Sequence, residues 1–329
     1  MREGSEGRGM TGIGARGARE ARVSFPSALK RILLRIRRHW QLYMVIAVPT
    51  AFLIIFNYIP MAGVQIAFRD YSPIGGIWHS PWIGMQEFQF FFQSPYFQPL
   101  IQNTLTLSLY ALLVGTPATI ILAVALNEVT NATFRRTVQM VTYAPYFIST
   151  VVLVGMMFII LSPSSGLISQ IYGFFGAPAP NLLASPTAFP SLYVWSGIWQ
   201  ETGYGAVIYL AALANVNLDL YEAARVDGAS RWQKILHIDL PAIKPTVIIL
   251  TILAVGNLMG IGFEKAYLLQ NPLNLSTSEI IPTYVYKNGL LDDNFSFAAA
   301  VGLFNSGVNF VLILIVNFVA RRVSDTSLF

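Results

Sequence analysis

The segment DLYEAARVDGASRWQKILHIDLP, residues 219–241, is densely charged within a chain that is otherwise strongly apolar. Charged residues (Asp, Glu, Lys and Arg) make up 11% of the 329-residue chain, which is less than half the share of about 25% usual for soluble proteins. Seven of them fall in this one segment: Asp219, Glu222, Arg225, Asp227, Arg231, Lys234 and Asp239. We therefore expect a folded, water-exposed segment between apolar parts of the chain.

Two short helices are predicted within this segment. Asp219, three residues before Glu222, is typical of a capping pair at a helix N-terminus. Gly228 can adopt the left-handed conformation that ends helices. Ser230 with Gln233 then predicts the start of a second helix.

The second helix is expected to stop before the next apolar run. Pro241 and Pro245 follow it, and the residue before a proline is disfavoured in the helical conformation. The segment thus reads as a compact helix pair within a loop that spans residues 215–245.

The apolar runs predict membrane spans. The chain is 54% hydrophobic with a mean hydropathy of +0.56, and a span needs roughly 20 apolar residues. The predicted fold is an all-α polytopic membrane protein with six transmembrane helices, near 42–66, 104–126, 138–161, 191–214, 246–264 and 298–320. Pro117 and Pro145 are expected to kink the second and third spans. Gly256 and Gly260 form a small-xxx-small pair that favours close packing of the fifth.

Positive charge indicates the orientation of these spans. With the N-terminus inside, the inner segments hold 18 of the 21 Lys and Arg residues; these segments are 1–41, 127–137, 215–245 and 321–329. The outer loops hold only Arg69, Lys265 and Lys287. The net charge of +5 is therefore an orientation signal rather than a sign of nucleic-acid binding, and both termini and the charged loop are expected in the cytoplasm.

The N-terminal region is expected to differ from the rest. Residues 1–26 are rich in Gly and Arg and predict a disordered cytoplasmic tail without a cleaved signal peptide. Residues 27–41 mix apolar and basic types, which predicts a basic helix lying on the membrane surface. Residues 42–329 form the predicted transmembrane domain.

The charged loop also carries a motif. It reads Glu222-Ala223-Ala224, three residues, Gly228, nine residues, and then Ile238-x-Leu240-Pro241. This pattern resembles the EAA motif of ABC importer permeases. In that family the loop is a coupling-helix pair that sits in a cleft of an ATPase subunit. The resemblance implies the same role here, with Asp227 and Trp232 added to the contact surface. For Trp232 and Ile235, packing against the first helix of the loop remains an equal alternative to ATPase contact.

The resemblance covers the chain from about residue 42 onward. NYIPMAGVQIAFRDYSP, WIGMQEFQFFF and NTLTLSL look like the oligo- and polysaccharide branch of the maltose-type permeases of type I ABC importers. It implies a multi-pass permease in the bacterial cytoplasmic (inner) membrane that moves a carbohydrate by alternating access. It also implies a second homologous permease chain, two ATPase subunits that hold ATP and Mg, an extracytoplasmic solute-binding protein and contact with membrane lipid. The chain itself is then no enzyme and needs no cofactor.

Polar and aromatic residues within the predicted spans are candidates for the substrate path. A charge at mid-bilayer costs about 2.5–3.5 kcal/mol on insertion scales, so Glu201 is not expected to face lipid. It could line the path with Gln200, close a buried pair, or lie in a wet vestibule if the helix breaks near Gly203. The other candidates are Trp195, Trp199, Asn257, Asn305 and Asn309; each could instead anchor at the membrane interface or hydrogen-bond a neighbouring helix.

Other function classes find less support in the sequence. No G-x-x-x-x-G-K-[ST] motif occurs, so a P-loop for ATP is excluded. His39, His79 and His237 fall on different sides of the predicted membrane and cannot form one metal site. A secondary transporter would need paired inverted repeats, and none is evident. A membrane-embedded glycan-processing enzyme would need convergent acids, whereas Asp292 and Asp293 are simply adjacent on an outer loop.

Overall fold

The computed structural model describes residues 38–323. The chain divides into two compact units, Met1–Ala62 and Gly63–Phe329. The described part is helical, and its only β pairing is an isolated antiparallel bridge between Arg69 and Trp82. The predicted tail and all but the end of the predicted surface helix lie outside the described residues.

The first unit is built on one apolar helix. α2 (Trp40–Leu53) passes through a π turn, η1 (Ile54–Tyr58), into the 3-10 segment η2 (Ile59–Phe68). The continuous run of 29 residues, Trp40–Phe68, is apolar enough to cross a membrane and covers the first predicted span. No residue of α2 is buried.

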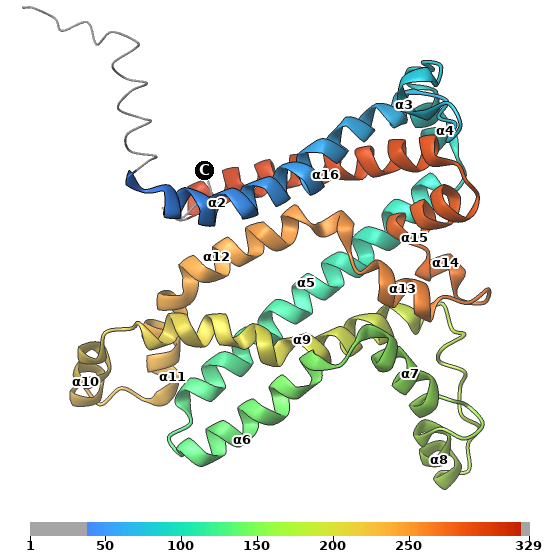
Figure 1. Ribbon diagram of the computed structural model, residues 1–329. Helices are drawn as coiled ribbons and strands as arrows, with labels where there is room; N and C mark the ends of the chain where they lie inside the picture. Colours follow the sequence, from blue (N-terminus) through green and yellow to red (C-terminus); the bar gives the residue numbers. More distant parts are fainter. Residues whose placement is uncertain (1–37, 324–329) are drawn as a thin grey trace, which may run out of the picture. The chain divides into compact units, whose positions relative to one another are not determined.

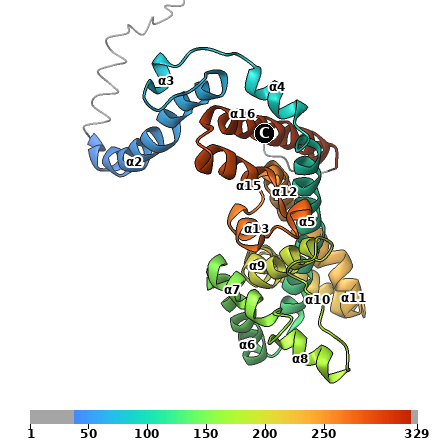
Figure 2. The same ribbon diagram turned by 90° about the vertical axis from the view of Figure 1, so that its right-hand side faces the viewer.

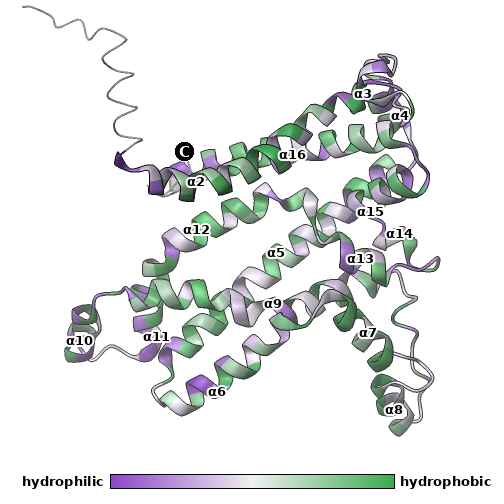
Figure 3. Ribbon diagram, viewed as in Figure 1, coloured by the Kyte–Doolittle hydropathy of each residue, from purple (hydrophilic) through white to green (hydrophobic). Residues whose placement is uncertain are grey.

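Four long helices form the frame of the second unit (Figures 1 and 2): α5 (Phe97–Glu128), α9 (Phe189–Ala214), α12 (Leu240–Gly256) and α16 (Phe295–Val323). α5 and α9 lie side by side, and their apolar side chains meet α12 in a buried cluster that includes Ala206, Leu213 and Ile243. Hydrophobic residues run along α5, α12 and α16 (Figure 3).

Short helices follow the long ones at the end remote from the charged loop: α3 (Gly76–His79), α4 (Gln86–Gln93), α8 (Leu167–Phe174), α13 (Phe263–Leu269), α14 (Leu275–Ser278), α15 (Ile281–Tyr286) and the π turn η6 (Lys287–Leu291). Phe91 of α4 is fully buried against the rings of Phe97, Phe297 and Phe304. This aromatic cluster joins α4 to α5 and α16.

The third predicted span, 138–161, is broken rather than kinked. α6 (Ala132–Tyr143), η3 (Ala144–Phe147) and α7 (Thr150–Ile160) bend by 100° at the break. Pro145 lies inside η3, and the hydroxyl of Ser149 accepts a hydrogen bond from the amide of Val152 (3.3 Å), which starts α7 as a new helix.

The fifth predicted span, 246–264, is also not one helix. α12 ends at Gly256, and a 3-10 turn, η5 (Leu258–Gly260), leads to α13. Asn309 of α16 accepts a hydrogen bond from the amide of Met259 (2.9 Å), and Ser108 of α5 donates one to the carbonyl of Leu258. These side chains satisfy backbone groups that the break exposes, so a helix could be replaced by a turn inside an apolar environment.

Composition alone identifies four helices among the described residues that could cross a membrane, or five if the bent pair is one span. α9 matches the predicted fourth span in extent but is too polar to be identified in this way, because it carries Gln200, Glu201 and several Gly and Ser residues. The count of six spans stays a prediction.

Candidate translocation cavity and coupling loop

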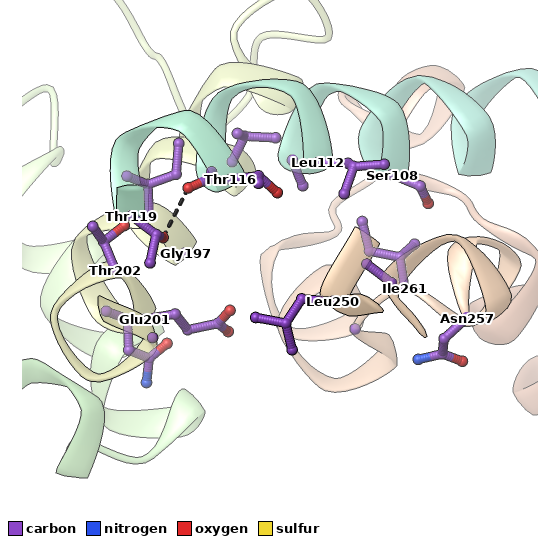
Figure 4. Close-up of a pocket in the computed structure, with 18 of the residues that line it drawn as sticks. Ser108, Leu112, Thr116, Thr119, Gly197, Glu201, Thr202, Leu250, Asn257 and Ile261 are labelled. Carbon is purple, nitrogen blue, oxygen red and sulfur yellow. Dashed lines mark hydrogen bonds between the residues drawn. The ribbon is translucent and has the colours of Figure 1, made fainter. Parts of the chain in front are cut away.

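A cavity of about 770 Å³ lies between α5, α9, α12 and the segment that leads into α13. Its wall combines hydroxyl groups with aliphatic side chains (Figure 4), including Ser108, Thr116, Thr119, Thr202, Leu112, Leu250 and Ile261. The volume falls within the range of about 300–1,000 Å³ usual for sites that hold small molecules.

One face of α9 contributes a row of three residues to this wall. Tyr193, Gly197 and Glu201 are spaced four apart and so lie on one side of the helix. The Tyr193 hydroxyl donates to the carbonyl of Gly262 (3.2 Å). Glu201 is solvent-exposed and forms no ion pair within 4 Å with any residue of the described range, which does not support the buried-pair alternative.

The alternative that α9 breaks near Gly203 is wrong. α9 is continuous from Phe189 to Ala214, and Gly203 is buried. A Cβ at Gly203 would lie 1.9 Å from the carbonyl oxygen of Thr142, so this glycine lets α6 approach α9 closely. Glu201 therefore reaches the cavity from an intact helix.

Lys265 of α13 is a cavity residue that sequence reasoning assigned only to an outer loop. Its Nζ lies 4.3 Å from the ring centroid of Tyr193, and a Cβ at Gly197 would lie 2.6 Å from the same atom. The absence of a side chain at Gly197 thus makes room for the ammonium group. The one available signal in the sequence was a lysine directly after the fifth apolar run.

Two of the other predicted path residues also line the cavity. Gln200 donates from Nε2 to the carbonyl of Ile148 (2.7 Å) and so bridges α9 to the break between η3 and α7. Asn257 is exposed at the end of α12, and its Oδ1 would lie 2.4 Å from a Cβ at Gly260. Gly260 thus accommodates Asn257, whereas Gly256 faces Ile313 of α16 (2.8 Å from a Cβ) and does mediate helix packing.

The remaining candidates lie outside this wall. The indole of Trp195 donates to the Tyr110 hydroxyl (3.0 Å), and Trp199 is about half exposed. Asn309 holds the turn at Met259. Asn305 has a buried Oδ1 that meets no hydrogen-bond partner among the described residues. Of the predicted path residues, Gln200, Glu201 and Asn257 line the cavity. The other four do not: Trp195, Trp199, Asn305 and Asn309.

The charged loop forms the predicted helix pair, α10 (Leu218–Val226) and α11 (Arg231–Lys234), as seen in Figure 1. Gly228 has φ = +74°, as predicted. The predicted capping box is confirmed: the Ser230 hydroxyl accepts from the Gln233 amide (3.3 Å), and Gln233 Oε1 accepts from the Ser230 amide (2.7 Å).

Two details of the loop differ from the prediction. Asn217 caps α10, since its Oδ1 accepts from the Asp219 amide (3.0 Å), and Asp219 lies in the first turn instead. The second helix does not end before Pro241: a π turn, η4 (Ile235–Asp239), carries it directly into α12. The missing amide of Pro241 falls in the first turn after this bulge, and Pro245 is accommodated inside α12.

Buried polar contacts tie the loop to the long helices. The Tyr221 hydroxyl of α10 donates to Oδ1 of Asp239 (2.5 Å), and Asp239 is fully buried. Burial, together with the hydrogen bond to Asp239 and its charge, raises the pKa of Tyr221 to about 12, so the hydroxyl keeps its proton. Lys234 pairs with Glu128 at the end of α5 (3.8 Å).

Large apolar side chains are exposed on the charged loop. Val226 and Trp232 are 88% and 74% exposed, beside the exposed motif residues Glu222, Ala223 and Asp227. Trp232 is thus not held by packing on α10. Ile235 instead packs into the core cluster of α5, α9 and α12.

Similarity to known proteins is extensive. Residues 115–325 match the family model described as binding-protein-dependent transport system inner membrane component. Two proteins of Bacillus subtilis (strain 168) are each 40% identical: Protein LplB, over 93% of this chain and 94% of its own length, and the polygalacturonan/rhamnogalacturonan transport system permease protein YteP, over 91% and 94%.

Solved structures agree with these relatives. A chain of a bacterial ABC transporter involved in the import of the acidic polysaccharide alginate has a TM-score of 0.83 and 39% identity, covering 89% of this chain and 99% of its own. A second, of an alginate ABC transporter in complex with an alginate pentasaccharide-bound periplasmic protein, has a TM-score of 0.84 and 38% identity over 91% and 100%. The predicted resemblance to permeases of oligo- and polysaccharide importers is thereby confirmed, and the chain is similar to the permease subunit of an alginate importer. The chain belongs to the family of binding-protein-dependent transport system inner membrane components, as a permease of the carbohydrate ABC importers.

Proposed function

We propose that this permease imports an acidic oligo- or polysaccharide, of which alginate is one candidate, and that the 770 Å³ cavity is its part of the route. The observation that carries the proposal is the cavity itself, because hydroxyl, amide and charged groups converge on an otherwise apolar wall. Ionisable groups within a helix bundle of a membrane protein usually face such a pathway. The similarity to the alginate transporter supports the substrate class.

The working unit is proposed to be larger than this chain. A second homologous permease would complete the path, two ATPase subunits would bind ATP and Mg, and an extracytoplasmic protein would deliver the saccharide. The similar alginate transporter in complex with a periplasmic protein supports the last of these partners. Both termini of this chain would be cytoplasmic, as the distribution of Lys and Arg favours.

The loop of residues 215–245 is proposed as the contact with the ATPase. Its exposed Val226 and Trp232 offer apolar anchors, and Glu222 and Asp227 surround them with charge. Aromatic anchors inside a polar rim are typical of protein interfaces. The Tyr221–Asp239 and Lys234–Glu128 contacts would pass a displacement of the loop on to α12 and α5.

Purification and reconstitution test this proposal. The chain, tagged and expressed with the permease, ATPase and binding-protein genes of its source, should co-purify with both partner types. In proteoliposomes, acidic oligosaccharides should stimulate ATP hydrolysis and be taken up in a vanadate-sensitive manner. Vanadate-insensitive uptake without ATPase subunits would contradict the proposal and favour a secondary transporter.

A further inference from the structure

Three cations lie in the predicted outer loops, and two of them are already engaged. Lys287 pairs with Glu279 (Nζ–Oε1 2.8 Å). Arg69 donates to the carbonyl of Ser80 (2.9 Å) and lies 5.6 Å from the ring of Trp82. Neither is among the residues that line the 770 Å³ cavity. The third cation, Lys265, lines the cavity and forms no ion pair within 4 Å with a described residue.

Lys265 presents an ammonium group to the cavity without a carboxylate in direct contact. It forms no ion pair within 4 Å in the range 38–323. Its Nζ lies 4.3 Å from the centroid of the Tyr193 ring, in the space left by Gly197, and the charge of Glu201 acts on it from beyond 4 Å. An ammonium has three N–H donors, and a cation–π contact orients the group without supplying a hydrogen-bond acceptor.

The cavity wall carries a negative side chain as well as the positive Lys265. Along α9, Tyr193 and Gly197 adjoin the ammonium, and Glu201 lies one turn beyond Gly197 on the same face. A carboxylate on a ligand would be attracted to Lys265, while Glu201 would accept hydrogen bonds from sugar hydroxyls and repel a second carboxylate. Charge-assisted hydrogen bonds are roughly twice as strong as neutral ones, so the Lys265 ammonium favours an anionic sugar.

We infer that Lys265 is a specificity-determining residue that binds the carboxylate of a uronate unit while the saccharide occupies the cavity. The inference rests on the proposed function, since it assumes that the cavity is on the route. Tyr193 holds the ammonium in place from one side, and Gly197 is the position whose lack of a side chain permits this placement. A neutral sugar meets the same hydroxyl-lined wall but leaves the ammonium without an anion.

The test compares variants of the reconstituted transporter on two matched ligands. One ligand is an oligouronate, and the other is the same oligosaccharide with its carboxyl groups reduced to alcohols. Lys265→Met removes the charge and keeps the length, Lys265→Arg keeps the charge, and Lys287→Met serves as a control on an outer cation away from the cavity. The measured quantity is the ratio of the half-saturating concentrations for the two ligands in stimulating ATP hydrolysis.

Because every variant uses the same binding protein, the selectivity of that protein cancels when the ratios are compared. Loss of a hydrogen bond to a charged group corresponds to about tenfold or more. We expect Lys265→Met to reduce the preference for the acidic ligand by about tenfold, whereas Lys265→Arg and Lys287→Met keep it within about threefold of wild type.

A second variant tests the geometry without touching the charge. In Gly197→Ala, the added methyl group meets a single neighbouring atom, Nζ of Lys265, and the helix conformation suits alanine. It should displace the ammonium and shift the ratio in the same direction as Lys265→Met. Adding Lys265→Met to Gly197→Ala should then have little further effect.

The outcomes separate the inference from the proposed function. If wild type responds to the saccharides but Lys265→Met and Gly197→Ala keep its ratio, the inference is overturned and the proposed route stands. If no acidic or neutral saccharide stimulates the wild-type complex, the proposed function fails and the inference fails with it.

Discussion

The Tyr221 hydroxyl donates a 2.5 Å hydrogen bond to Asp239, and this bond joins α10 to the residue immediately before α12. Asp239 is fully buried, and its second carboxylate oxygen meets no hydrogen-bond partner among the described residues. A buried carboxylate with one donor depends heavily on that donor. The relationship makes Tyr221 a positioning residue for the loop.

Removing this donor should loosen the loop. Tyr221→Phe deletes one hydroxyl and leaves Asp239 without it, which costs about 1–3 kcal/mol. We expect a lower unfolding temperature of the purified complex and weaker substrate stimulation of ATP hydrolysis. Asp239→Asn replaces the buried carboxylate by a neutral amide. In a double-mutant cycle, the loss of stability caused by Tyr221→Phe should therefore be smaller when Asn occupies position 239. Additive effects of the two substitutions would show that the hydrogen bond does not couple them.

The corner of the loop should tolerate glycine far better than branched residues. Gly228 has φ = +74°, and nothing lies within 4 Å of a Cβ built there, so the penalty is conformational, at roughly 1–2 kcal/mol for ordinary residues. We expect Gly228→Val to leave membrane insertion intact while it weakens ATPase co-purification or uncouples hydrolysis from uptake. Glu222→Lys, which reverses a charge on the same loop, should have the same effects. Gly228→Asn is the matched control, since asparagine tolerates this conformation. Wild-type assembly and transport by both test variants would remove the loop from the coupling role.

The close approach of α6 to α9 should depend on Gly203. A Cβ there would lie 1.9 Å from the backbone oxygen of Thr142, and backbone cannot rotate away as a side chain can. Gly203→Ala should destabilise the complex by at least about 1–3 kcal/mol, seen as a lower unfolding temperature. Gly155→Ala, in α7, meets nothing within 4 Å and should be neutral. Equal unfolding temperatures for the two variants would contradict this packing.

Glu201 should matter for transport rather than for assembly. Glu201→Gln keeps the size of the side chain and removes the negative charge from the cavity wall. We expect altered uptake and substrate-stimulated hydrolysis with unchanged subunit composition. Glu264→Gln, an exposed neighbour of Lys265 outside the cavity lining, is the control. Unaltered transport by Glu201→Gln would exclude Glu201 from the route.

The predicted orientation can be tested by labelling, because the chain contains no cysteine. Thr133 and Ser164 are exposed and fall on opposite sides of the membrane in the prediction. Cysteine at Thr133 should react with an impermeant maleimide only from the cytoplasmic side, and cysteine at Ser164 only from outside. Reaction of both from one face would overturn the six-span map.

The parts of the molecule that depend on local chemistry could be predicted from the sequence. The Ser230–Gln233 capping box and the left-handed Gly228 follow from two or three neighbouring residues. The cap of α10 could not be assigned, because Asn217 and Asp219 are both good caps and the choice depends on where the chain leaves α9.

Features that depend on packing between distant segments were not predictable. The break after Gly256 is stabilised by Ser108 and Asn309, which lie far away in the sequence. The position of Lys265 over Tyr193 follows from that break, since a continuous span would carry the lysine elsewhere. Hydropathy identifies apolar runs but does not record where a turn interrupts them.

The π turn at Ile235–Asp239 joins α11 to α12 in a helical run from Arg231 to Gly256, 26 residues long. At 1.5 Å per residue such a rod is about 39 Å long. One end carries the exposed Trp232, and Leu250 near the other forms part of the cavity wall. If this run moves as one rod, a tilt of the end that carries Trp232 would shift Leu250 sideways, and the cavity would change its width without any change in the secondary structure that encloses it.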